Sequence, residues 1–93
     1  MIKVAVRSRG NGWDCDVSVA SASFRVSVES ADLQRWGRGD RLEDVADLVR
    51  RSFEFLLERE PPESILSTFD LAVIQRYFPE YDRLFKRPSH LGP

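Results

Sequence analysis

Hydrophobic and polar residues alternate in three successive runs within the first thirty residues. In each run apolar side chains occupy every second position, with small, polar or charged side chains between them; these apolar positions are Ile2, Val4 and Val6, then Trp13, Cys15, Val17 and Val19, then Phe24, Val26 and Val28. A period of two is typical of a strand that is buried on one face only. The pattern predicts a three-stranded antiparallel meander over residues 1–30, with the thiol of Cys15 on the inner face.

The residues between these runs predict how the strands pair. Asn11-Gly12 is a favoured centre for a two-residue hairpin turn, because both positions tolerate a positive φ. The strand pairs that follow are Val6–Val17 and Val4–Val19 on the buried face, and Arg9–Asp14 and Arg7–Asp16 on the outer face. A second turn at Ser21-Ala22 predicts the pairs Val19–Phe24, Val17–Val26 and Cys15–Val28. Both faces are then chemically consistent.

The period changes to that of a helix between residues 40 and 60. Apolar side chains recur every three or four positions and form one stripe, which comprises Leu42, Val45, Ala46, Val49, Phe53, Leu56 and Leu57. Asp40 is expected to cap this helix, with Glu43 reaching back toward it, and Pro61 ends it. The chain is therefore predicted to have the α+β class, with a long helix over about 41–59 covering one face of the meander.

Two further apolar residues of this helix, Leu48 and Phe55, lie outside the main stripe. Either the C-terminal segment or a second copy of the protein must cover them, and if exposed they would form an interaction site. Short helices are predicted over about 64–78, the second of them over 71–78 and capped by Ser67 or Asp70. Residues 1–86 are expected to form a single domain, and residues 87–93 a flexible tail.

The loop at residues 35–41 is the main candidate for a nucleic-acid site. It combines Arg35, Trp36, Arg38 and Arg41 with two glycines. Aromatic rings stack on bases and arginines contact phosphates, so this loop is a candidate for binding RNA or single-stranded nucleic acid. The alternative, which we favour, is that Trp36 closes one end of the core. Residues 30–35, just before it, form either a strand extension or a helical turn.

Composition narrows the functional classes. The 93 residues carry a net charge of −1, with +2 in residues 1–41 and −3 in residues 42–93. A duplex-binding protein usually has a basic excess on one face, so this balance disfavours that class. The outer-face arginines Arg7, Arg9 and Arg25 fit a ladder of Arg–Asp pairs better than a phosphate-binding strip. With one cysteine, no signal sequence and no long apolar run, we expect a cytoplasmic protein without a membrane partner.

No pattern predicts catalysis, a metal or a cofactor. His90 is the only histidine and lies in the expected tail, and no cluster of His and Cys ligands exists. The carboxylates Asp70, Glu80 and Asp82 are dispersed and suggest no acid–base pair. We therefore expect a protein that is not an enzyme and needs no cofactor.

The predicted β-β-β-α order resembles the small HicB-type domain of bacterial toxin–antitoxin systems. The resemblance is carried by Ile2–Arg7, Trp13–Ala20, Phe24–Glu29 and the helix Leu42–Leu57, about two thirds of the chain. HicB-like sequences usually have a Pro-Gly loop after the second strand, where this chain has Ser21-Ala22-Ser23. The segment from Pro62 to Tyr81 is also similar to stretches of small bacterial proteins.

The resemblance implies a bacterial antitoxin-like protein whose partner is a co-expressed toxin. From the residues we expect a non-catalytic protein–protein interaction module. It would bind another protein, or itself as a homodimer, through an edge strand or through the ridge formed by Leu48 and Phe55.

Overall fold

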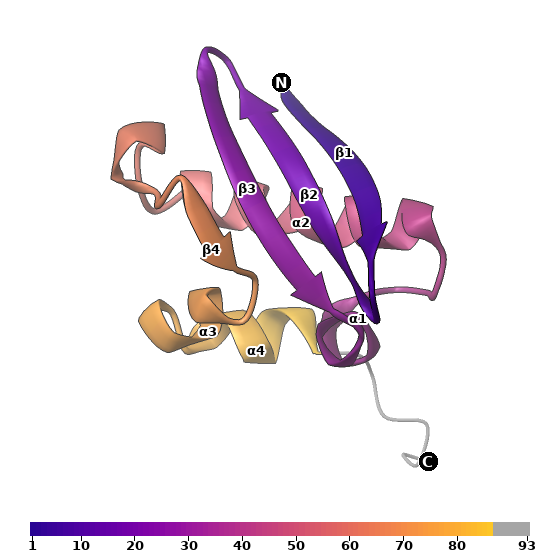
Figure 1. The fold of residues 1–93 in the computed structure, drawn as a ribbon. Coiled ribbons are helices and arrows are strands. Elements are labelled where there is room, and N and C mark those ends of the chain that lie inside the picture. Colours follow the sequence, from indigo (N-terminus) through magenta and orange to yellow (C-terminus); the bar gives the residue numbers. More distant parts are fainter. Residues whose placement is uncertain (87–93) are drawn as a thin grey trace.

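A computed structural model describes residues 1–86 of the chain (Figure 1). The element order is β1 (Ile2–Arg9), β2 (Gly12–Val19), β3 (Ala22–Glu29), α1 (Ser30–Trp36), α2 (Leu42–Leu57), a 3₁₀ turn at Pro62–Ser64, β4 (Thr68–Asp70), α3 (Val73–Tyr77) and α4 (Glu80–Phe85). The predicted α+β class, with a meander followed by a long helix and short C-terminal helices, is confirmed. The predicted tail and His90 lie outside the described residues.

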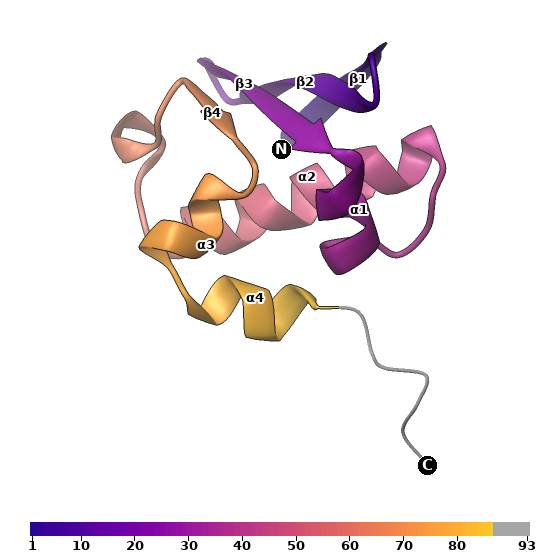
Figure 2. The same ribbon diagram turned by 60° about the horizontal axis from the view of Figure 1, so that its bottom comes forward.

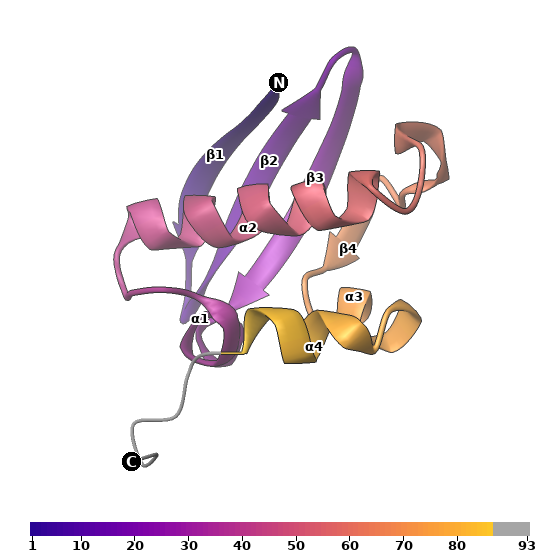
Figure 3. The same ribbon diagram turned by 180° about the vertical axis from the view of Figure 1, so that it is seen from behind.

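The long helix α2 crosses one face of the sheet (Figure 3). Its main stripe packs on the inner sheet face, and Val45, Val49 and Phe53 are completely buried against β-strand residues such as Val17 and Val26. The short helices α3 and α4 lie to one end, and α2 lies between the sheet and α4 (Figure 2). The core thus has a sheet layer, a helix layer and a C-terminal helical cover.

The predicted pairing of β1 with β2 is wrong by two residues. Val4 is opposite Val17 and Val6 is opposite Cys15, so the two-residue turn is Gly10-Asn11 instead of Asn11-Gly12. Gly10 supplies the positive φ of this turn, at 56°. Gly12 is a strand residue instead, where a Cβ atom would collide with the carbonyl oxygen of Val28. Because the shift is two residues, every side chain keeps its predicted face.

The second turn shifts in the same way. Val17 is opposite Phe24 and Cys15 is opposite Val26, so the turn residues are Ala20 and Ser21 instead of Ser21 and Ala22. Ala20 has a φ of 53° and is the only non-glycine residue among residues 1–86 with a positive φ. Alanine carries no sequence signal for this conformation, which is why the pattern placed the turn one residue too late.

A fourth strand, β4, was not predicted. Its three residues pair parallel to β3, with Phe69 opposite Val26. The backbone N–H of Arg25 donates to the carbonyl of Ser67 at 2.7 Å, and the N–H of Leu71 donates to that of Ser27 at 2.9 Å. The predicted cap at Ser67 or Asp70 is therefore wrong, because this segment pairs with the sheet and α3 begins later, at Val73.

The helices α1 and α2 begin in similar ways. In α1 the carboxylate of Asp32 accepts a hydrogen bond from the N–H of Glu29 at 2.9 Å, and in α2 that of Asp44 accepts from the N–H of Arg41 at 3.0 Å. Each carboxylate thus provides a hydrogen-bond acceptor for the backbone N–H of the residue just before its helix. The predicted Asp40 cap is therefore wrong, since Arg41 is the N-cap and Asp44 replaces Glu43. Of the two alternatives for residues 30–35, the helical turn is the one observed.

The Cys15 thiol provides a test of this core. Cys15 faces inward as predicted and is completely buried, and burial raises the pKa of the thiol to about 12 from 9.0. Because the thiolate is the nucleophile, we expect Cys15 to react with Ellman's reagent at pH 8 about 1,000-fold more slowly in the folded protein than in guanidinium chloride. Native and unfolded rates within tenfold of each other would contradict a closed inner sheet face.

Candidate interaction surfaces

The ridge formed by Leu48 and Phe55 is covered by the chain itself. Leu48 is 0% exposed and Phe55 is 5% exposed. The ring of Phe55 lies edge-on against three rings of the C-terminal segment, with centroid separations of 5.8 Å to Phe78, 5.4 Å to Tyr81 and 5.8 Å to Phe85. Of the two predicted covers, the C-terminal segment is the one observed, so neither residue lies on a free surface in this fold.

Tyr81 is the centre of this C-terminal cover. Its side chain is completely buried, and burial raises the pKa of its hydroxyl group. The hydroxyl forms a 2.7 Å hydrogen bond with the hydroxyl of Ser52, which also donates to the backbone carbonyl of Leu48 at 2.7 Å. The buried hydroxyl groups of Ser52 and Tyr81 are thereby satisfied, so the contact between α2 and α4 is a packed core contact.

The predicted nucleic-acid loop is held by the same cover. Trp36 is 2% exposed, its ring packs edge-on against that of Tyr81 at 5.1 Å, and its indole N–H donates to the carboxylate of Asp82 at 2.8 Å. The guanidinium of Arg35 also donates to Asp82 at 2.6 Å, and together these bonds lower the pKa of Asp82 to about 2. In this fold Trp36 therefore closes the core and presents no ring face for stacking on a base.

The other two arginines of the loop do not converge on Trp36. Arg38 is exposed, and the guanidinium of Arg41 lies 4.0 Å from the carboxylate of Glu43. The structure therefore does not bring the four candidate residues into one basic site with an exposed aromatic ring.

The outer face of the sheet carries the predicted ladder of Arg–Asp pairs. Arg9 contacts Asp14 at 2.8 Å, while Asp16 contacts Arg7 at 3.0 Å and Arg25 at 3.2 Å. The corrected strand pairing makes the contacts of Arg7 and Arg9 diagonal instead of directly opposite. Exposed pairs of this kind contribute about 0–1 kcal/mol each to the stability of the fold. The carboxylates of Asp14 and Asp16 offset most of the positive charge that would be needed to bind a phosphate.

The edge of β1 is an open strand. The strand order is β1-β2-β3-β4, so β1 has a neighbour on one side only among the described residues. In an antiparallel ladder every second residue directs its N–H and C=O away from the neighbouring strand. Proteins usually protect such an edge by proline, by a bulge, by charged side chains or by keeping the strand short. β1 has eight residues, no proline and unbroken pairing with β2, so its only protection of these kinds is the charge of Lys3, Arg7 and Arg9 on the outer face.

The apolar surface under β1 continues past this edge. Ile2, Val4 and Val6 face the core but are only partly buried, whereas Cys15 and Val17 on the adjacent strand are completely covered. The N-terminal end of α2 projects beyond β1 (Figures 1 and 3). Leu42, which the sequence pattern placed in the buried stripe, stands at this end and is 54% exposed. The helix layer is thus wider than the sheet at the β1 side.

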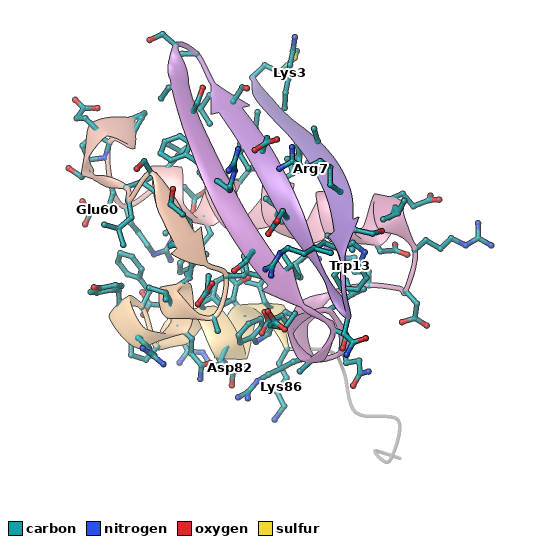
Figure 4. All side chains as sticks on the ribbon, in the orientation of Figure 1. Lys3, Arg7, Trp13, Glu60, Asp82 and Lys86 are labelled. Carbon is teal, nitrogen blue, oxygen red and sulfur yellow. The ribbon has the colours of Figure 1, made fainter. Side chains whose placement is uncertain are left out.

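A hollow lies at the opposite side of the molecule, between the end of α2, the segment before β4, and α3. Its volume is about 440 Å³, and its walls are Leu56, Glu60, Ser64, Ile65, Leu66, Phe69, Val73, Ile74, Tyr77 and Phe78. Figure 4 shows Glu60 at the side of the sheet away from Lys3 and Arg7. Sequence reasoning missed this hollow because it depends on β4, which has no periodic signal.

The described residues contain no arrangement that suggests a metal site. No three or more His, Cys, Asp or Glu side chains within residues 1–86 gather closely enough to hold an ion. None of the helices in that part of the chain has the length and apolarity needed to cross a membrane. Comparison with protein-family models, curated proteins and solved structures finds no match to this chain.

Proposed function

We propose that this protein is a non-catalytic interaction module that binds an extended segment of a partner protein as an additional strand beside β1. The observation that carries the proposal is the overhang of α2, which extends the helix layer past the last strand and leaves Leu42 exposed there. An added strand would complete the backbone hydrogen bonding of β1 and place alternate side chains on this apolar surface.

The charges on β1 specify the partner. The strand has no acidic residue, and three basic residues lie on its outer face. Arg7 and Arg9 pair with Asp16 and Asp14, whereas Lys3 has no ion-pair partner within residues 1–86. Opposite charges on neighbouring strands stabilise a sheet, and like charges directly opposite destabilise it. The expected partner segment therefore alternates apolar residues, facing Leu42 and Val4, with acidic residues on the outer face. A second copy of β1 would bring basic residues near basic residues, so we favour a different protein over a homodimer.

The resemblance to HicB-type domains suggests which class of protein this partner belongs to. If the protein is antitoxin-like, the partner is a co-expressed bacterial toxin that contributes the extended segment. The order of three antiparallel strands followed by α2 supports this interpretation, although α1 intervenes between β3 and α2.

Site-specific photo-crosslinking in the source cells tests the proposal. p-Benzoylphenylalanine replaces Lys3 or Leu42 at the open edge, and the control replaces Leu84, which is 58% exposed on α4. We expect both edge positions to crosslink to the same segment of one partner, with alternating apolar and acidic residues, and position 84 not to do so. Crosslinks confined to position 84, or edge crosslinks to a second copy of this chain, would contradict the proposal.

The purified partner then permits a charge test. We expect Lys3→Glu to weaken binding about two- to fivefold, because it places an acidic residue beside the acidic segment. The matched control is Arg83→Glu, which reverses an exposed charge on α4 and should leave the affinity unchanged. Equal effects of the two substitutions would show that the overall charge of the protein matters and not the edge.

A further inference from the structure

The hollow beside β4 has the chemistry of a binding site for a cation. Three aromatic residues, Phe69, Tyr77 and Phe78, contribute to its walls, together with aliphatic side chains and a single charged residue, Glu60. No Lys or Arg lines it. Aromatic ring faces and a carboxylate both attract a positive charge, and the attraction is stronger where the surroundings exclude water.

Glu60 differs from the neighbouring acidic residues of α2 and α4. Glu54 pairs with Arg50 at 3.3 Å, and Arg59 lies 3.3 Å from Glu58 and 3.5 Å from Glu80. Within residues 1–86, Glu60 is half-buried and its side chain has no hydrogen-bond or ion-pair partner. The only carboxylate in the walls of the hollow is therefore available to a ligand.

We infer that this hollow binds a small organic cation, an ammonium group carried on an aromatic or branched aliphatic body. The apolar walls would take the body of the ligand, while Glu60 and the ring of Tyr77, which is 69% exposed, would contact the ammonium group. A volume of about 440 Å³ lies within the range of small-molecule sites, about 300–1,000 Å³. This site lies near β4, at the opposite edge of the sheet from β1, and does not depend on the binding proposed at β1 (Figure 4).

An NMR titration with 2-phenylethylammonium tests this inference. We expect saturable amide shifts confined to residues around the hollow, such as Ser64, Phe69 and Tyr77. The uncharged analogue 2-phenylethanol, which has nearly the same shape, should bind about tenfold more weakly because it cannot form the charged contact. Equal binding of the amine and the alcohol, shifts located elsewhere, or no saturable shifts would each overturn the inference.

Two matched variants assign the effect to Glu60. Glu60→Gln keeps the shape of the side chain and removes its charge, and we expect it to weaken amine binding about tenfold without changing the binding of the alcohol. Glu63→Gln removes a nearby exposed carboxylate that does not line the hollow and should have no effect. The amide spectrum of each variant shows that it is folded. Unchanged affinity in Glu60→Gln would overturn the inference.

The source of the cation is tested in the same titration. N-acetyl-arginine methylamide represents an arginine side chain of a partner protein. We expect it to bind more weakly than the amine, because its backbone groups have no partners in apolar walls. Tighter binding of the arginine derivative would assign the hollow to a protein side chain and contradict a small-molecule site.

Discussion

Replacing Phe55 by alanine is expected to lower the free energy of unfolding by about 3–5 kcal/mol. The side chain is 5% exposed and contacts the rings of Phe78, Tyr81 and Phe85, and the guanidinium of Arg59 lies 3.6 Å from its ring centroid. Alanine would leave a cavity between α2 and α4 that these rings can fill only in part. Urea unfolding of both proteins measures the difference.

The matched control is Leu84→Ala on α4. Leu84 is 58% exposed, so this substitution should change the free energy of unfolding by no more than about 0.5 kcal/mol. A cost below about 1 kcal/mol for Phe55→Ala would mean that the C-terminal helices do not pack on α2. The ridge formed by Leu48 and Phe55 would then be free, and the interaction site predicted there from the sequence would take precedence over the β1 edge.

Trp36→Ala is expected to have an effect of similar size, about 3–5 kcal/mol. The variant loses the buried indole ring, its contact with Tyr81 and its hydrogen bond to Asp82. Trp36→Phe keeps an aromatic ring and loses the N–H donor, so we expect a cost of about 1–2 kcal/mol. Urea unfolding again gives the measurement, with Arg38→Ala as a surface control that should be nearly neutral.

The Trp36 variants also separate the two interpretations of the loop. If the loop binds single-stranded nucleic acid, Trp36→Ala would remain stable and lose binding to a labelled oligonucleotide at low salt. A core role predicts the opposite, a destabilised protein and no oligonucleotide binding by either the wild type or the folded Trp36→Phe variant. Stable Trp36→Ala with lost binding would therefore contradict the packing described for this residue.

The periodic parts of the chain could be predicted because each has one buried face. Alternation in β1 to β3 and the stripe along α2 give the layers, and the side chains keep their faces even though both turns shift. The exact turns could not be predicted, because they depend on contacts between strands. Gly12 lies against the backbone of Val28, and Ala20 adopts a positive φ that alanine does not signal.

The surfaces were harder to predict than the fold. Whether Leu48 and Phe55 are exposed depends on where Tyr81 and its neighbours pack, and a periodic pattern gives no information about such long-range contacts. Leu42 follows the helical stripe perfectly, yet it is exposed because the helix is wider than the sheet. The unmatched carboxylate of Glu60 becomes notable only once β4 and α3 enclose a hollow beside it.

Hydrogen–deuterium exchange of the protein with its crosslink-identified partner tests the central claim most directly. If the partner adds a strand beside β1, the alternate amides of Ile2–Arg9 that point away from β2 and the first turn of α2 should gain protection, while exchange in α4 stays unchanged. Loss of protection in α4, with β1 unaffected, would contradict this account. It would show that the partner displaces the C-terminal helices and binds the ridge formed by Leu48 and Phe55.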